Sequence, residues 1–191
     1  PNSRVLILPA DHAVEDETIL RRALERAAWV AGQRPDAPVL LGITPTSADG
    51  DLGWVVPAGQ PDADSHAVER FVEKPGPEIA RRLMSAGAMW NAFLLVSKGA
   101  ALMHLFERHL PELHAPLAAR PRSRGEGRSA RSFESLPPRD FSHALLTPAA
   151  AGLRVIRVPA CGWTDLGTPA RLFEWLASHG APVEAGGSGS A

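Results

Sequence analysis

Short apolar runs alternate with an amphipathic segment along the first 45 residues. The run RVLIL at 4–8 stops at Pro9 and has the form of a strand buried on both faces. Residues 15–32 place apolar side chains at helical spacing behind an acidic first turn. The run PVLLGI at 38–43 resembles a second buried strand. A strand, a helix and a strand within about forty residues predict a βαβ crossover, and therefore a mainly parallel sheet.

The pattern changes after Pro45. Two extended runs, LGWVVP at 52–57 and HAVERFVEKP at 66–75, flank a turn region rich in Gly, Pro and Asp, which favours an antiparallel pair. The remaining predicted elements are a helix at 76–87, a strand at 88–97, a helix broken at Pro111 over 98–119, a short helix at 140–146, a strand at 153–159 and a helix at 168–180. Together they predict an α/β domain over 1–180 with a doubly wound, mixed, mainly parallel sheet of the Rossmann-like kind.

Two segments lack the composition of a packed core. Residues 120–139 are rich in Arg, Ser, Gly and Pro, which is typical of a flexible surface loop, and the glycine-rich end at 181–191 has the composition of a disordered tail. A strand is predicted almost directly after Pro1, so we expect the chain to be the later portion of a longer protein.

Charge and cysteine content narrow the function classes. The 191 residues carry 20 basic and 21 acidic side chains, so the chain has no net positive charge to attract nucleic acid, and no nucleic-acid partner is expected. The single cysteine, Cys161, excludes an intramolecular disulfide and a cysteine-clustered zinc site, and it fits a reducing, cytoplasmic setting. No run approaches the roughly 18 apolar residues that span a bilayer, so no membrane partner is expected. A homo-oligomer is compatible with the sequence, but no pattern in it indicates one.

Two aspartates follow apolar strands at positions where α/β sheets place ligand groups. Asp11 follows the strand RVLIL, and Asp165 follows the strand at 153–159 through a short bend. Taken alone, Asp11 is explained as well by a helix-capping or turn role as by a catalytic one, and Asp165 is better explained as a turn carboxylate. If both strands lie near the middle of one sheet, however, the two carboxylates meet over one crevice and can bind Mg²⁺, with substrate phosphates and water as its other ligands.

Three further polar residues are candidates for ligand binding. Glu73 and Lys74 end an extended run before Pro75, where they form either a solvated charge pair or a sugar and phosphate contact. Their side chains diverge unless the strand bends, and Pro75 favours a bend. Asn91 lies inside the apolar run AMWNAFLLV, so its amide either satisfies the backbone or faces a polar ligand.

With these stretches in view, the chain resembles the nucleotidyltransferases that activate sugar 1-phosphates, and most closely the mannose-1-phosphate guanylyltransferase branch. The resemblance covers nearly all of 4–176 and is carried, in order, by LILPADH, GITPTSADGDLGWVV, VERFVEKP, AMWNAFLLV, DFSHALL and GWTDLGTPARL. It implies a nucleotide-diphospho-sugar transferase fold, Mg²⁺ as cofactor, and GTP and mannose 1-phosphate as partners.

The resemblance also implies roles for individual residues. Asp11 and Asp165 would bind Mg²⁺, Glu73 and Asn91 would contact the sugar, and Lys74 would contact its phosphate. Gly53 would let the backbone approach the hexose. The implied reaction joins mannose 1-phosphate to GTP, giving GDP-mannose and pyrophosphate. A transferase that uses UTP or dTTP, or a non-catalytic domain that binds a sugar nucleotide for regulation, remains an alternative.

One family feature has no counterpart in residues 1–191, namely the glycine-rich loop that wraps the triphosphate and the base. Such a loop stabilises the leaving pyrophosphate. We therefore predict that this chain alone turns over slowly or not at all.

Overall fold

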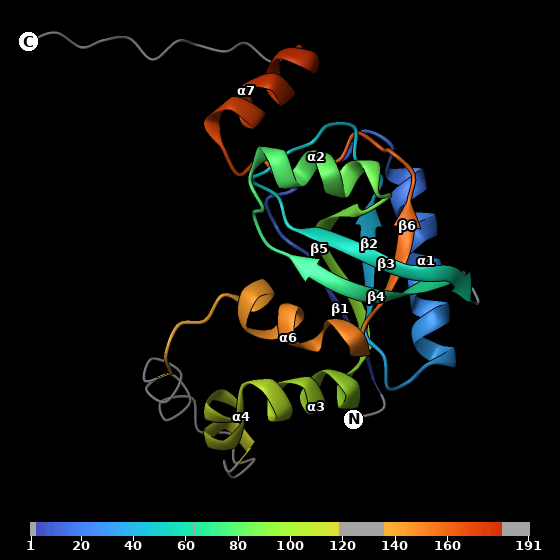
Figure 1. Cartoon of the computed structure of the whole chain (residues 1–191), viewed down its shortest axis with the longest axis vertical. Helices are drawn as coiled ribbons and strands as arrows, with labels where there is room; N and C mark the ends of the chain where they lie inside the picture. Colours follow the sequence, from blue (N-terminus) through green and yellow to red (C-terminus); the bar gives the residue numbers. More distant parts are fainter. Residues whose placement is uncertain (1–2, 63, 119–135, 181–191) are drawn as a thin grey trace, which may run out of the picture.

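The computed structural model describes residues 3–62, 64–118 and 136–180 and shows a central sheet with helices on both faces (Figure 1). Most of the predicted loop at 120–139 and the predicted tail at 181–191 lie outside the described residues. The strands are β1 (Arg4–Ile7), β2 (Val39–Ile43), β3 (Trp54–Asp62), β4 (Ser65–Val72), β5 (Met89–Lys98) and β6 (Arg154–Val158). The helices and helical turns are α1 (Glu17–Gln33), α2 (Pro77–Ser85), α3 (Gly99–His109), α4 (Pro111–Ala118), the π-helical turn η1 (Ser142–Leu146), α6 (Thr147–Ala149), the 3-10 turn η2 (Ala150–Gly152) and α7 (Pro169–Ser178).

The sheet is mixed, as predicted, but its parallel share is smaller than expected. The strand order is β1-β5-β2-β6-β4-β3, and β3 also pairs with the start of β5. Among the described strands only β2 and β6 are hydrogen-bonded in parallel. β1 and β2 do run in the same direction, as the βαβ pattern predicted, but β5 lies between them and pairs antiparallel with both. This insertion joins segments far apart in sequence, so local patterning could not reveal it.

The first strand is less buried than its apolar sequence suggested. β1 lies at one end of the strand order and alternates between exposed and half-buried positions. Leu6 is 49% exposed and Leu8, just beyond the strand, is 50% exposed. The prediction of a strand buried on both faces is therefore wrong for β1, whereas every residue of β2 is buried.

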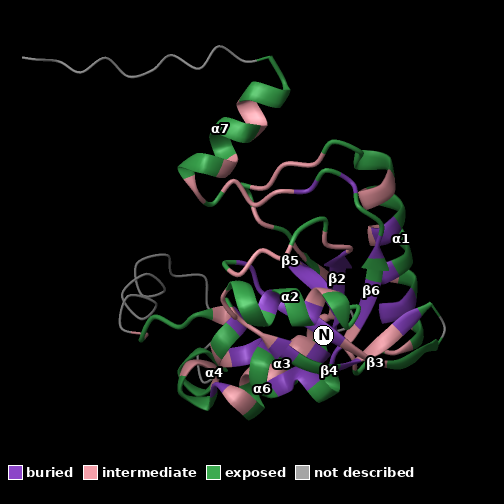
Figure 2. Cartoon of the chain, turned by 45° about the horizontal axis from the view of Figure 1, so that its top comes forward, coloured by how far each residue is buried: buried purple, intermediate pink, exposed green. Residues whose placement is uncertain are grey.

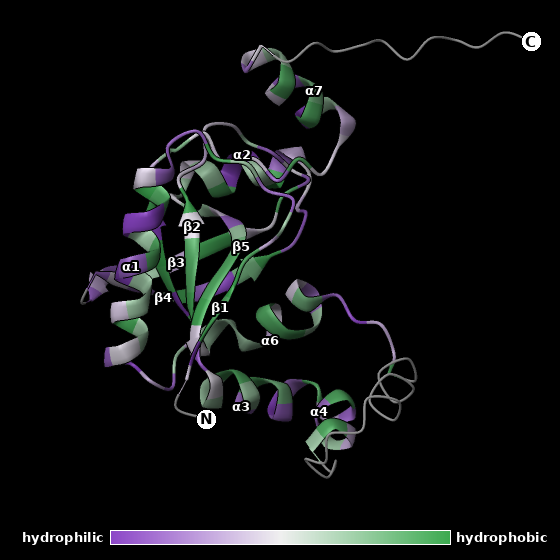
Figure 3. Cartoon of the chain, turned by 180° about the vertical axis from the view of Figure 1, so that it is seen from behind, coloured by the Kyte–Doolittle hydropathy of each residue, from purple (hydrophilic) through white to green (hydrophobic). Residues whose placement is uncertain are grey.

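The core forms two layers, one on each face of the sheet. Alternate residues of a strand point to opposite faces, so Leu41 packs into the layer under α1 and α2, while its neighbour Leu40 packs into the layer that α3 and η1 cover. Figure 3 shows the hydrophobic colouring concentrated on β2, β5 and β1. This arrangement of helix, sheet and helix confirms the predicted α/β class.

Two helices illustrate how the sequence sets element boundaries. The Asp16 carboxylate caps α1 by accepting hydrogen bonds from the backbone N–H groups of Thr18 and Ile19 at 2.9 and 3.1 Å. Thr168 caps α7 by accepting from the Arg171 N–H at 3.3 Å, and Pro169 occupies the first helical position. The two helices differ in packing, since α1 buries four residues and α7 buries none. In Figure 2, α7 stands away from the buried strands and carries no buried colouring.

The strands position one edge of the sheet for a site. Trp90 at the start of β5 pairs with Ile43 at the end of β2 and with Trp54 at the start of β3. Trp54 in turn pairs with Val72 at the end of β4. The loops that follow β1, β4 and β6 and those that precede β3 and β5 therefore have access to this same edge.

Candidate active site

A cavity of about 370 Å³ lies at this edge and gathers the predicted site residues. Asp11, Gly53, Glu73, Lys74, Asn91 and Asp165 all line it. They come from five separate segments of the chain, and the fold brings all of them together. Sequence reasoning did not single out several other lining residues, among them Asp51, Phe93, Ser142 and Trp163.

A short antiparallel bridge joins the loops that carry the two aspartates. Ala13 and Thr164 exchange both backbone hydrogen bonds, at 2.9 and 3.0 Å. Asp11 precedes this bridge by two residues and Asp165 follows it by one. Since residues paired in this way lie about 5.5 Å apart at their Cα atoms, the bridge holds the two carboxylates at the same cavity.

His12 lies beside both carboxylates. The indole N–H of Trp163 donates to His12 Nδ1 at 3.2 Å, and the two rings meet edge to face with centroids 5.2 Å apart. An Nδ1 that accepts a hydrogen bond belongs to a neutral imidazole. Burial lowers the pKa of His12, although the charges of Asp11 and Asp165 oppose that effect. His12 thus acts as a neutral link between the two aspartate loops.

The EKP segment bends at the end of β4, as predicted. Lys74 adopts a left-handed backbone conformation, with φ of 42°, just before Pro75. This turn lets Glu73 and Lys74 face the same cavity, whereas successive residues of a straight strand would diverge. Burial raises the pKa of Glu73, Asp140 adds to the increase, and Lys74 and His143 oppose it.

The neighbours of Gly53 leave little room for a side chain. A Cβ atom at position 53 would lie 2.8 Å from Glu73 Oε2 and 3.1 Å from the Phe71 ring. The backbone oxygen of Gly53 accepts a hydrogen bond from the Asn91 N–H at 2.8 Å. The missing side chain therefore makes room for the Glu73 carboxylate inside the cavity.

Asn91 supports the backbone of its own strand and also lines the cavity. Its side-chain oxygen accepts a hydrogen bond from the Phe93 N–H at 3.2 Å, which supports an irregularity in β5. The residue is 8% exposed and still lines the cavity. One amide group is thus both a backbone support and a lining group.

Strained backbone accompanies the site. Of the four non-glycine residues with positive φ among the described residues, Lys74 and Phe93 line the cavity and Leu166 directly follows Asp165. Such conformations cost about 1 to 3 kcal/mol each and persist where surrounding structure enforces them, often at functional sites. Their concentration here is independent support for a functional site.

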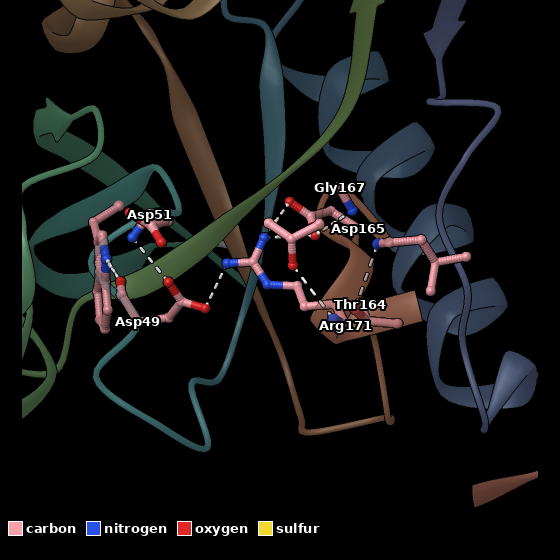
Figure 4. A network of polar contacts seen from close by, with 9 residues as sticks. Asp49, Asp51, Thr164, Asp165, Gly167 and Arg171 are labelled. Carbon is pink, nitrogen blue, oxygen red and sulfur yellow. Dashed lines mark hydrogen bonds and ion pairs between the residues drawn. The ribbon is translucent and has the colours of Figure 1, made fainter. Parts of the chain in front are cut away.

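Asp165 is held in place by an ion pair that the sequence did not reveal. Arg171, from the first turn of α7, directs Nη1 to both oxygens of Asp165 at 2.8 and 3.0 Å, and Nη2 to Asp49 Oδ2 at 2.6 Å (Figure 4). Burial lowers the pKa of Arg171, but the hydrogen bond with Asp49 and the charges of both aspartates outweigh it, so that pKa is raised. Asp49 and Arg171 are 122 positions apart in sequence, so no local pattern could have paired them.

The donor set fits Mg²⁺ but not a metal held by protein alone. Among residues 3–62, 64–118 and 136–180, no group of three or more His, Cys, Asp or Glu side chains is arranged to hold a metal ion. Mg²⁺ in phosphate-transferring enzymes is commonly bound through one or two carboxylates together with substrate phosphates. Asp11 and Asp165 supply two carboxylates at one cavity, which matches that mode of binding.

The fold and the cavity define a three-layer α/β protein with an acidic, strand-edge site. A family model described as nucleotidyl transferase matches residues 1–179, and the chain belongs to this family.

Named relatives agree with this assignment. The chain is 28% identical over 180 residues to the alginate biosynthesis protein AlgA of Pseudomonas syringae pv. tomato, and the match covers 89% of this chain and 36% of the relative. It is 28% identical over 170 residues to a mannose-1-phosphate guanylyltransferase of Sinorhizobium fredii, covering 86% of this chain and 32% of the relative. The chain thus spans about a third of the length of these curated relatives.

A solved structure supports the fold. The crystal structure titled mannose-1-phosphate geranyltransferase, from Thermus thermophilus, superposes with a TM-score of 0.74 and 28% identity, covering 86% of this chain and 47% of that one. Within the described part of the chain, no helix is long and apolar enough to cross a membrane.

Proposed function

We propose that this chain provides the sugar-phosphate and metal-binding part of a nucleotidyltransferase that converts GTP and mannose 1-phosphate to GDP-mannose and pyrophosphate. The observation that carries the proposal is the meeting of Asp11, Gly53, Glu73, Lys74, Asn91 and Asp165 in one cavity. Family membership and the names of the relatives support the reaction class.

The proposed reaction is an in-line displacement. A phosphate oxygen of mannose 1-phosphate attacks the α-phosphorus of GTP and forms the new P–O bond. The bond from the α-phosphorus to the bridging oxygen breaks, and pyrophosphate leaves with that electron pair. Because both reactants are anionic, the protein's contribution is alignment and charge neutralisation rather than covalent chemistry.

Each lining group has a role suited to its chemistry. Lys74 is exposed at the cavity and offers an ammonium donor to the sugar phosphate. Glu73, when ionised, accepts hydrogen bonds from sugar hydroxyls. Gly53 lines the same cavity without a side chain, so its backbone would approach the hexose while leaving room for the Glu73 carboxylate. Asp11 and Asp165 would hold Mg²⁺, which when bound neutralises phosphate charge and favours departure of pyrophosphate.

The sugar-phosphate half of the proposal can be tested by binding. We expect Lys74→Ala to weaken the binding of mannose 1-phosphate about tenfold or more, as loss of a charge-assisted hydrogen bond would. Binding of mannose, which lacks the phosphate, should be unchanged. Isothermal titration calorimetry in the presence of Mg²⁺ measures both.

The other lysine of the sequence, Lys98, provides the matched control. It ends β5, at the opposite end of that strand from Asn91, and Lys98→Ala should bind mannose 1-phosphate as the unsubstituted chain does. Equal affinities in all three proteins would contradict the role of Lys74. Preference for glucose 1-phosphate over mannose 1-phosphate would contradict the proposed sugar.

A further inference from the structure

Asp165 is already occupied by a cationic side chain. Its carboxylate offers about four lone-pair positions. Arg171 Nη1 takes one on each oxygen, at 2.8 and 3.0 Å, and the Gly167 N–H takes another on Oδ1 at 3.1 Å. One position on Oδ2 is left within this network.

The guanidinium is anchored on its other side as well. Nη2 contacts Asp49 Oδ2 at 2.6 Å, and the second oxygen of Asp49 accepts from the Asp51 N–H at 2.8 Å. The side chains of Arg171, Asp49 and Asp165 are only 17%, 25% and 23% exposed. Solvent therefore screens this bridge less than a surface ion pair.

Arg171 also links the site to a helix with little other attachment. α7 has no buried residue, and Leu172 and Phe173, which follow Arg171, are 39% and 50% exposed. The bridge to Asp49 and Asp165 thus connects α7 to the sheet edge.

A divalent ion bound to Asp165 would compete with this guanidinium for the carboxylate. Mg²⁺ binds a carboxylate oxygen directly at about 2.0 to 2.1 Å. Such an ion would stand close to the positive charge of Arg171, in a site with limited screening, where the two cations repel each other strongly. Full access to Asp165 requires the guanidinium to move.

We propose that Arg171 is a built-in counter-cation of Asp165, which a divalent metal ion must displace, so that metal binding loosens α7. This inference rests on the proposed metal-binding role of Asp11 and Asp165. It makes Arg171 a positioning residue that sets the affinity of the site for a cation and couples that affinity to α7.

The first test is binding of Mn²⁺, used as a paramagnetic substitute for Mg²⁺, to the 191-residue chain without substrate. We expect Arg171→Gln to bind Mn²⁺ about tenfold more tightly. The metal ion would no longer have to replace a hydrogen bond between two charged groups, and the loss of one such bond corresponds to about a tenfold change in affinity. Electron paramagnetic resonance of free Mn²⁺ gives the affinity. Arg82→Gln is the matched control, because Arg82 pairs with Glu78 on the exposed side of α2 at 2.6 Å, away from the cavity lining.

The outcomes separate this inference from the proposed function. Equal or weaker binding by Arg171→Gln, with saturable binding by the unsubstituted chain, would overturn the competition and leave the metal site intact. No saturable binding by either protein would overturn both. Loss of binding in Asp11→Asn or Asp165→Asn must accompany any supporting result.

A second measurement needs no Arg171 variant and so does not depend on that variant folding. If Arg171 weakens the binding of Mg²⁺ to Asp165, then bound Mg²⁺ must weaken the contact between Arg171 and Asp165 by the same factor. Mg²⁺ should therefore speed hydrogen exchange of α7 amides, such as the Leu172 N–H that bonds the Thr168 backbone oxygen at 3.0 Å, in the unsubstituted chain but not in Asp165→Asn. Slower or unchanged exchange with bound Mg²⁺ would overturn the inference.

Discussion

The two sides of the cavity are built differently. One side comes from β4, β5 and the start of β3. There, Asn91 in β5 and Gly53, just before β3, are buried and joined by a backbone hydrogen bond. The other side comes from the loop after β6, where Asp165 is held mainly by a guanidinium from the weakly packed α7. The groups proposed to contact the sugar thus lie on a preorganised wall, whereas Asp165, a proposed metal ligand, lies on a segment held by polar contacts.

The largest expected difference in stability is between two aromatic residues, Trp54 in β3 and Phe173 in α7. Trp54 is completely buried at the start of β3, so Trp54→Ala should lower the free energy of unfolding by about 3 to 5 kcal/mol. Phe173 on α7 is 50% exposed, so Phe173→Ala should change it by less than about 0.5 kcal/mol. Urea denaturation measures both, and similar losses would break the comparison.

The next effect tests the preorganised wall itself. Gly53→Ala places a Cβ 2.8 Å from Glu73 Oε2, so we expect a cost of about 1 to 3 kcal/mol in stability and weaker binding of mannose 1-phosphate. Gly152→Ala is the control, since its added Cβ meets nothing within 4 Å. Unchanged sugar-phosphate affinity in folded Gly53→Ala would contradict the placement of the sugar at this glycine.

The polar side should respond to loss of charge. Asp165→Asn weakens the pairing with Arg171 and should lower the free energy of unfolding by about 1 to 2 kcal/mol. Asp11 is exposed, and Asp11→Asn should change stability by less than about 0.5 kcal/mol. Thermal denaturation in the absence of metal compares the two; equal stabilities would show that the Arg171 bridge does not anchor Asp165.

The smallest expected effect is a pH dependence of the free energy of unfolding, caused by Glu73 at the end of β4. Burial raises the pKa of Glu73 above its ordinary value of 4.5, so the folded chain binds this proton more tightly than the unfolded chain. The free energy of unfolding should therefore fall as pH rises from 4.5 through the raised pKa. Glu73→Gln should remove this fall and be more stable at pH 7 by about 0.5 kcal/mol, a modest gain because the group is only partly buried.

The matched control for Glu73 is Glu69→Gln. Glu69 is exposed on the same strand, β4, so its replacement should leave the pH profile unchanged. Denaturation midpoints between about pH 4 and 8 provide the data. A Glu73→Gln profile parallel to that of the unsubstituted chain would contradict the assigned cause.

Much of the fold followed from local pattern, because capping and periodicity are encoded locally. The α1 and α7 boundaries agree with the predicted helices to within a few residues, since Asp16 and Thr168 cap them. The insertion of β5 between β1 and β2 did not follow, because pairing between distant segments depends on the whole sheet. The exposure of β1 was missed for the same reason, since an apolar run does not say how many neighbours cover it.

The sequence likewise predicted part of the candidate site and missed another part. The six predicted residues converge because strand ends and turns of an α/β sheet share one edge, which the sequence order of the motifs indicates. Arg171 and Asp49 were missed because a long side chain reached across from a separate helix. The left-handed conformation of Phe93 was also hidden, since a bulky aromatic residue gives no local signal for positive φ.

Asp11, Asp165 and Lys74 line one cavity, so a metal ion at the two aspartates would stand close to a sugar phosphate bound at Lys74. Phosphorus-31 relaxation of mannose 1-phosphate in the presence of Mn²⁺ tests it directly, because the metal broadens the signal only of a phosphate bound close to it. We predict strong broadening with the unsubstituted chain, its loss in the double variant Asp11→Asn/Asp165→Asn, and a marked reduction in Lys74→Ala at the same subsaturating ligand concentration. Broadening that persists in the double aspartate variant, or its absence in the unsubstituted chain at saturating ligand, would contradict the account.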